Sequence, residues 1–201
     1  MNRLIPRIGA AVVTVTVALF ALFLILDLTF GSYLVCMFLP LGWIMMAAGF
    51  LHESPADRRV PAVVGLALSA VYTVLILLVY YAQTTSVRLE DLTAQAARAL
   101  DYRQGGLMFN YDLLGYGMMA LSTFFSGLSM VPACRRDRWL KALMLIHGVF
   151  FLSCFFMPMT GMFTGMAGSG GKGGTIALVI WCAYFLPIGI LGILHFGKAE
   201  P

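Results

Sequence analysis

Charged residues are scarce in this chain. Only 13 Lys or Arg and 9 Asp or Glu occur among 201 residues, or 11%, whereas soluble domains contain about 25%. The apolar fraction is 61% and the mean hydropathy is +0.91. A soluble domain of this size cannot bury so much apolar surface, so we expect lipid to surround much of the chain. This composition also excludes a disordered chain, a collagen, a coiled coil and a small disulfide-rich scaffold.

Paired cysteines, lysines within apolar runs and paired histidines are also missing. The four cysteines are isolated and form no C-x-x-C pair, which argues against a thiol oxidoreductase or a zinc ribbon. The three lysines lie at the ends of apolar runs or between them, which excludes a retinal protein. No paired histidines for haem, and no arrangement typical of an intramembrane protease, are present. We therefore expect no cofactor, no metal and no catalytic residue, and we favour a protein without enzymatic activity.

Long apolar runs occupy most of the chain instead. A helix of about 20 residues crosses the hydrocarbon core of a membrane, and six stretches have this length: Ile8–Leu26, Tyr33–Leu51, Val60–Tyr81, Leu107–Val131, Trp139–Met159 and Thr175–Leu194. They predict an all-α, polytopic fold in which residues 1–201 form a single integral membrane domain. The first run is too long for the apolar region of a signal peptide, so we expect it to be retained.

The basic residues predict the orientation of these spans. If the N-terminus is cytoplasmic, nine Lys or Arg lie on the cytoplasmic side and four on the other, as the positive-inside rule requires. We therefore expect both termini in the cytoplasm and a multi-pass protein of a bacterial cytoplasmic (inner) membrane. The basic clusters flank spans and form no domain face, which argues against nucleic acid as a partner. They suit anionic lipid head groups of the bilayer.

Two loops on the opposite, extracytoplasmic side have distinct compositions. The segment Ala82–Gly106 predicts one short amphipathic helix, with Ser86 as its cap, Glu90 and Asp91 in its first turn, and glycines at its end. This helix either lies on the membrane surface or forms a lid over an outward-facing pocket. The loop Thr160–Gly174 has seven glycines in fifteen residues and predicts a flexible linker. Pro40 and Pro187 each predict a kink in their spans.

The fourth span carries a stripe of small and polar residues. The stripe residues follow one another at steps of three and four, which places them on one helix face: Asp112, Gly115, Met119, Ser122, Ser126 and Ser129. Polar groups are costly to expose to lipid, so we expect this face to point inward. The stripe either allows close helix packing alone, or combines packing with a polar cavity.

Asp112 is the first candidate site residue on this stripe. It lies about 8 Å below the predicted outer end of its span, where it could bind a cation or a proton. Alternatively it is an interfacial residue that pairs with Arg88 or Arg103. The other residues predicted to line an outward pocket are Tyr72, Tyr80, Gln83, Asp27, Asn110 and Tyr116. The tyrosines among them could instead form an ordinary aromatic belt at the membrane interface.

The histidines supply two further candidates. His147 lies deep in the fifth span, where it either packs or gates protons, because an imidazole titrates near neutrality. His52, Glu53, Asp57 and His195 gather at the predicted inner surface, but no H-x-x-x-H or H-E-x-x-H spacing supports a metal site.

These features favour a small transporter or channel-like protein for a small solute or ion, with proton coupling as one version of it. In this hypothesis Asp112 binds the ion, and Ser122, Ser126 and His147 continue the path inward. The first alternative is a sensor or accessory subunit that binds a partner and has no turnover, and a homo-oligomer fits either function. The second is a membrane-embedded enzyme acting on lipid, which requires His52, His195 and Glu53 to meet.

Overall fold

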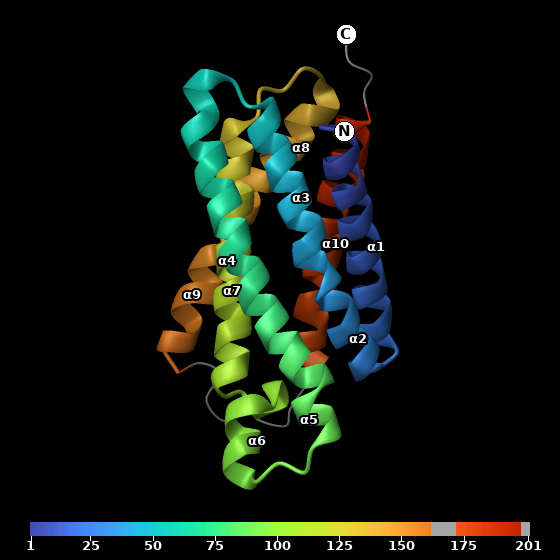
Figure 1. Cartoon of the computed structure of the whole chain (residues 1–201), viewed down its shortest axis with the longest axis vertical. Coiled ribbons are helices and arrows are strands. Elements are labelled where there is room, and N and C mark those ends of the chain that lie inside the picture. The colour runs from blue at the N-terminus through green and yellow to red at the C-terminus, as the bar shows by residue number, and fades with distance from the viewer. Residues whose placement is uncertain (162–171, 198–201) are drawn as a thin grey trace.

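The computed structural model describes residues 1–161 and 172–197, and all regular structure within these residues is helical, with no strand. The predicted all-α fold is therefore confirmed (Figure 1). The elements in chain order are α1 (Leu4–Ile25), α2 (Thr29–Cys36), α3 (Phe38–Glu53), η1 (Ala56–Arg58), α4 (Arg59–Thr84), α5 (Ser86–Leu89), α6 (Ala94–Leu100), η2 (Tyr102–Gln104), α7 (Leu107–Ser129), α8 (Arg135–His147), α9 (Phe150–Met159) and α10 (Lys172–Phe196).

Five helical segments of the described chain are long and apolar enough to cross a membrane. They are Leu4–Ile25, Thr29–Glu53, Ala56–Leu89, Arg135–Met159 and Gly174–Phe196. The fourth predicted span, now α7, is not among them, although its 23 residues make it about 35 Å long. Asn110, Asp112 and its serines lower its hydropathy. The polar residues that make α7 a candidate for a functional site thus also give it a lower hydropathy than the five segments above.

Two of the predicted spans are interrupted. The second divides into α2 and α3 at Met37, because Pro40 has no N–H to bond the carbonyl of Cys36. The fifth divides into α8 and α9 at Gly148 and Val149, whose amides bond carbonyls three residues back (Gly148 N to Leu145 O, 3.2 Å; Val149 N to Ile146 O, 3.1 Å). α10 passes through Pro187 as one helix.

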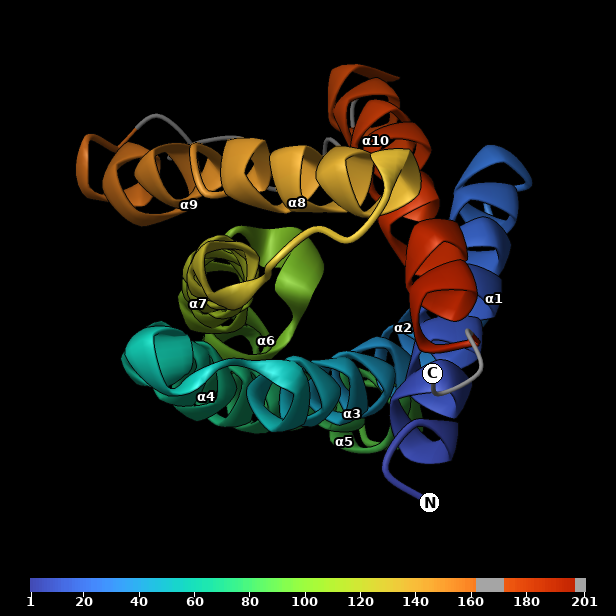
Figure 2. The same ribbon diagram turned by 90° about the horizontal axis from the view of Figure 1, so that it is seen from above.

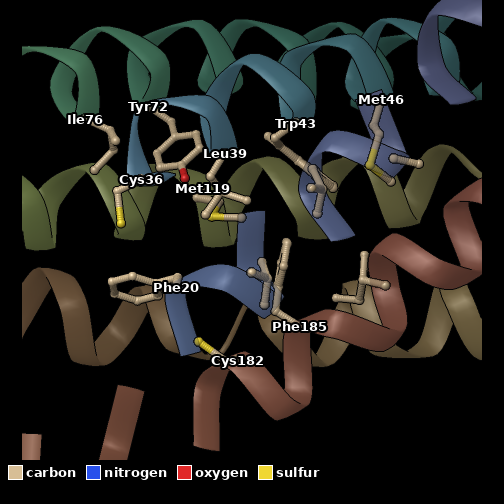
Figure 3. Close-up of a cluster of buried hydrophobic side chains, with 14 of the residues drawn as sticks. Phe20, Cys36, Leu39, Trp43, Met46, Tyr72, Ile76, Met119, Cys182 and Phe185 are labelled. Atoms are coloured by element: carbon tan, nitrogen blue, oxygen red, sulfur yellow. The ribbon is translucent and has the colours of Figure 1, made fainter. Parts of the chain in front are cut away.

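The helices α4, α3, α1, α10 and α8 surround α7 on most of its sides (Figure 2). α7 packs most extensively on α4 and also contacts α8, α9 and α3, whereas α1 packs on α3 and α10. Large side chains fill the interior between these helices, and Trp43, Tyr72, Met119 and Phe185 are all buried there (Figure 3). The core is therefore formed by residues from all the long helices.

Small residues allow the closest helix crossings. A Cβ atom added to Gly9 on α1 would lie 2.5 Å from the carbonyl oxygen of Gly42 on α3, and one added to Gly42 would lie 2.8 Å from that of Gly9. On α4, a Cβ atom added to Gly65 would lie 2.7 Å from Ser126 Oγ on α7. Such contacts are typical of helix packing within membranes, where small residues let backbones approach.

The bundle has two distinct ends (Figure 1). The terminal end holds Met1, the turn between α3 and α4, the start of α8 and the C-terminal end of α10; the loop end holds the α1–α2 turn, α5, α6 and η2. At the terminal end Arg58 Nη1 (3.1 Å) and Lys141 Nζ (2.9 Å) both donate to the carbonyl oxygen of Met130, which directly follows α7. Cations there suit the negative end of the helix dipole.

The segment between α4 and α7 differs from its prediction, because it contains two short helices and not one. Thr93 caps α6 by accepting the Ala96 amide (3.3 Å), whereas Ser86 caps nothing with its side chain. Glu90 and Asp91 therefore lie between α5 and α6 and not in a first turn. The expected glycine ending is wrong for the helix itself, because α6 ends at Leu100 with Asp101 as its C-cap. Gly105 instead ends η2, in a left-handed conformation (φ 64°). Residues 162–171 of the predicted glycine linker lie outside the described residues.

Candidate functional site

The polar stripe of α7 faces the interior of the bundle. All six of its residues, from Asp112 to Ser129, are buried, while the larger side chains on the remaining faces are partly or fully exposed. This confirms the orientation predicted from the spacing. On α4, the predicted pocket residues Tyr72, Tyr80 and Gln83 are buried, together with Ser69.

The half of the stripe nearer the terminal end joins three helices. Ser122 Oγ accepts a hydrogen bond from Trp43 Nε1 on α3 (2.8 Å) and donates one to the carbonyl of Gly65 on α4 (2.7 Å). Ser129 donates to the carbonyl of Ser126 (2.8 Å), and Ser126 Oγ has no hydrogen-bond partner in the described part of the chain. These serines therefore contribute directly to the packing of α3, α4 and α7.

The other half of the stripe presents a buried carboxylate. Asp112 is 3% exposed, and no Lys, Arg or His of the described residues lies within ion-pair distance of it. The hydroxyl groups of Tyr80 on α4 and Tyr102 on η2 interact with the carboxylate, but its Oδ1 atom has no hydrogen-bond partner among the described residues. Asp112 is thus a buried carboxyl group that has no counter-charge among the described residues.

Tyrosine rings enclose this carboxylate. Their centroids lie 5.6 Å apart for Tyr33 and Tyr80, 6.3 Å for Tyr80 and Tyr102, and 5.8 Å for Tyr72 and Tyr116. Burial, followed by the charge of Asp112, raises the pKa of Tyr102 well above its usual value, so this hydroxyl keeps its proton and can donate. The hydroxyl of Tyr72 is buried without a hydrogen-bond partner in the described chain. The cluster therefore has spare hydrogen-bonding capacity.

Gln83 holds the η2 segment beside the cluster of Asp112 and the tyrosines through two hydrogen bonds to backbone groups. Its Nε2 donates to the carbonyl of Leu100 (2.7 Å), and its Oε1 accepts the amide of Tyr102 (3.0 Å). Gln83 thus binds backbone at the loop end of α4 and does not present a free amide to a pocket. Tyr102, which the sequence analysis missed, is brought to Asp112 by this contact.

Two of the predicted pocket residues do not join the cluster. Asn110 is exposed, because two positions along a helix from Asp112 place it about 200° away around the axis. Asp27 is also exposed, in the turn between α1 and α2. The two arginines considered as partners of Asp112 bind elsewhere: Arg103 pairs with Asp101 (3.1 Å), and Arg88 lies over the ring of Phe30 (4.9 Å to the centroid).

His147 is fully enclosed, and both of its ring nitrogens are engaged. Trp181 Nε1 on α10 donates to His147 Nε2 (3.1 Å), and His147 Nδ1 lies 2.7 Å from Thr123 Oγ1 on α7. Since Thr123 donates its hydroxyl hydrogen to Ala120 O (2.7 Å), it accepts from Nδ1–H, and the imidazole is neutral in this network. His147 thereby connects α8 to α7 and α10, and taking up a proton would require it to lose the Trp181 hydrogen bond.

The predicted inner cluster forms in part, at the terminal end. Glu53 and His195 lie 2.9 Å apart, and Asp137 of α8 contacts the other ring nitrogen of His195, also at 2.9 Å. His52 and Asp57 are exposed. Of the three residues that the lipid-acting enzyme requires, Glu53 and His195 are the two in direct contact. No group of three potential ligands in the described chain could hold a metal ion. Asp137 was not predicted as a site residue, although an acidic residue in the first turn of a helix is a recognisable signal.

Together, the apolar helices and the inward polar stripe define a helical protein of the multi-pass membrane class. Comparisons with protein-family models, with curated proteins and with solved structures find no match for this chain.

Proposed function

We propose that this protein is a small transporter or channel-like protein for a small cation or proton in a bacterial cytoplasmic membrane. In this proposal α7 is the fourth of six spans, both termini are cytoplasmic, and the loop end faces outward. Asp112 is the ion-binding residue. The single observation that carries the proposal is that this carboxylate is buried without a cationic partner among the described residues.

A buried carboxylate without a cationic partner indicates a bound cation or proton for an electrostatic reason. Asp112 lies about 8 Å from the end of its span, so it carries part of the roughly 2.5–3.5 kcal/mol that an Asp at the centre of a span costs on insertion scales. Buried charges in proteins are normally paired or bind a cation. The hydroxyls of Tyr80 and Tyr102 can donate hydrogen bonds to the carboxylate, but they carry no positive charge. A proton or a small cation on Asp112 would supply the missing charge, and carboxylate and hydroxyl oxygens suit hard cations.

The route inward follows the stripe of α7 from Asp112 through Ser122 and Ser126, with His147 beside it. In the structure Ser122 and His147 are held in hydrogen bonds between helices. Movement of an ion along this route therefore requires α7 to separate from α3 or α8. The proposal thus implies a second conformation, as alternating access does in other transporters.

Flux measurements in proteoliposomes test the proposal. With Asp112→Asn we expect proton or monovalent-cation flux to fall at least about tenfold, because the amide cannot carry the charge. Asp27→Asn is the matched control, since Asp27 is an exposed carboxylate at φ 54°, a conformation that Asn tolerates. A second variant, His147→Ala, tests the inner part of the route. Wild-type flux in both Asp112→Asn and His147→Ala would overturn the assignment.

A sensor or accessory subunit without turnover is the second candidate. The observation that favours it is the set of satisfied hydrogen bonds joining Trp43, Ser122 and Gly65, and joining Trp181, His147 and Thr123. These contacts need no solute to explain them. A partner that co-purifies with wild type, together with the absence of flux above protein-free liposomes, would favour this candidate over the transporter.

A further inference from the structure

Three helices meet through titratable side chains at the terminal end, far from Asp112. Glu53 ends α3, Asp137 lies in the first turn of α8, and His195 lies in the last turn of α10. We propose that these three residues form a proton-binding site, in which a protonated His195 holds α10 against both α3 and α8. This inference is independent of the proposed transport function.

The hydrogen-bond geometry determines the protonation state. His195 Nδ1 lies 2.9 Å from Asp137 Oδ1, and His195 Nε2 lies 2.9 Å from Glu53 Oε2. Ionised carboxylates only accept hydrogen bonds, and a neutral imidazole donates from one nitrogen only. An imidazolium donates from both, so it is the form that satisfies the two contacts with both carboxylates ionised. Loss of its proton would leave a nitrogen lone pair facing a carboxylate oxygen.

The surrounding charges are consistent with this assignment. Glu53 also pairs with Arg3 (Nε to Oε1, 3.4 Å), which precedes α1. The other titratable groups nearby are His52 on α3, which is exposed, and Arg7 on α1, close to Gly197. Arg3 thus places a positive charge against Glu53, and the imidazolium places one against both carboxylates. Loss of the proton from His195 removes the second of these charges.

The protein fixes each partner of His195 in place. Asp137 is 2% exposed, and its Oδ2 accepts the amide of Ala133 (3.1 Å) at the start of α8, where the helix dipole favours a negative charge. The rings of Phe50 and Phe196 lie against the imidazole, with centroids at 5.8 and 4.9 Å. His195 can thus lose its bonds to the carboxylates only by moving with α10 or by changing rotamer within a packed site.

A small cavity adjoins the site and gives the proton a route. It has a volume of about 50 Å³ and is lined by Glu53, His195 and Ser129, among others. Such a volume accommodates about one or two water molecules. The His195 side chain itself is 12% exposed. Since Ser129 is the last residue of the α7 stripe, release of α10 would open the bundle where that stripe ends.

Nitrogen NMR of the histidines in lipid nanodiscs tests the inference. The chain has only three histidines, and a His52→Gln variant identifies one resonance while leaving the site intact. At neutral pH we expect both nitrogens of His195 to be protonated and hydrogen-bonded. In Asp137→Asn we expect this histidine to lose its proton at a pH at least about one unit lower, because one acceptor charge is gone. A single protonated nitrogen on wild-type His195 at neutral pH would overturn the proposal.

Stability as a function of pH gives an independent readout. The contribution of the imidazolium is present at low pH and is lost as the pH rises past the point where His195 deprotonates. Wild type should therefore lose thermal stability as the pH rises above the usual titration range of a histidine, whereas His195→Gln should change less and His52→Gln should follow wild type. Equal pH profiles for wild type and His195→Gln would contradict the proposal. Flux through Asp112 bears on neither result, so the two proposals can fail separately.

Discussion

Substitution of Gly9 by alanine tests how closely α1 and α3 must approach. The added Cβ atom would lie 2.5 Å from the carbonyl oxygen of Gly42, 2.6 Å from the Cβ atom of Met45 and 3.2 Å from the amide nitrogen of Met46. Favourable contacts between carbon atoms lie at about 3.5–4.0 Å. Two of the three neighbours are backbone atoms, so no side-chain rotation relieves the overlap. The helices must therefore separate by about 1 Å at this crossing.

The expected cost combines two opposing effects. Inserting a methyl group into a packed core costs about 1–3 kcal/mol, and we take the upper part of this range because backbone atoms are involved. Alanine in a helix interior is favoured over glycine by about 1 kcal/mol. The net loss is about 2 kcal/mol, which corresponds to about a 30-fold change in the folding equilibrium.

Gly117→Ala is the matched control for this prediction. A Cβ atom there would meet Cys154 at 3.5 Å and Phe151 at 3.6 Å, which are ordinary contact distances. We therefore expect Gly117→Ala to be neutral or to stabilise the protein by up to about 1 kcal/mol. The free energy of unfolding, measured by circular dichroism in mixed micelles with increasing dodecyl sulfate, compares the two variants. The reasoning is refuted if Gly9→Ala unfolds within about 0.5 kcal/mol of Gly117→Ala.

Two further substitutions test the site. Gln83→Leu should release η2 from α4, because it removes the hydrogen bonds to Leu100 and Tyr102; we expect amide hydrogen exchange in residues 94–104 to accelerate at least about tenfold. Exchange in the long helices should stay unchanged, and the exposed Gln95→Leu serves as control. Trp181→Phe removes the donor to His147 Nε2, and a buried acceptor without a partner costs about 1–3 kcal/mol. Thermal unfolding measures this loss; a stability equal to that of the exposed Trp139→Phe variant would show that the hydrogen bond is unimportant.

Local patterns along the sequence predicted the helices and their buried faces. The spacing from Asp112 to Ser129 identified the inward face of α7, because helical periodicity depends only on neighbouring residues. Pro40 predicted a kink in the second span for the same reason, and the structure has an interruption there. The pairing of His195 with Asp137 could not be predicted, since 58 positions separate them and only the packing of α10 on α8 brings them together.

The composition of the candidate site was predicted in part. Tyr80 was placed near Asp112 because both belong to polar faces at the outer ends of their helices. Asn110 was grouped with Asp112 by closeness in sequence, although the helix turns it to the surface. Tyr102 was missed because its position depends on the Gln83 contacts, which cross from a helix to an irregular segment.

The carbonyl of Met130 has a consequence for how this bundle can move. Because Arg58 and Lys141 both bind it, the beginning of α4, the end of α7 and the first half of α8 share one anchor point. These three helices are thereby fastened into a common base. A rearrangement that widens this part of the molecule and keeps this anchor must move α3, or α10 with α1 packed on it, away from that base.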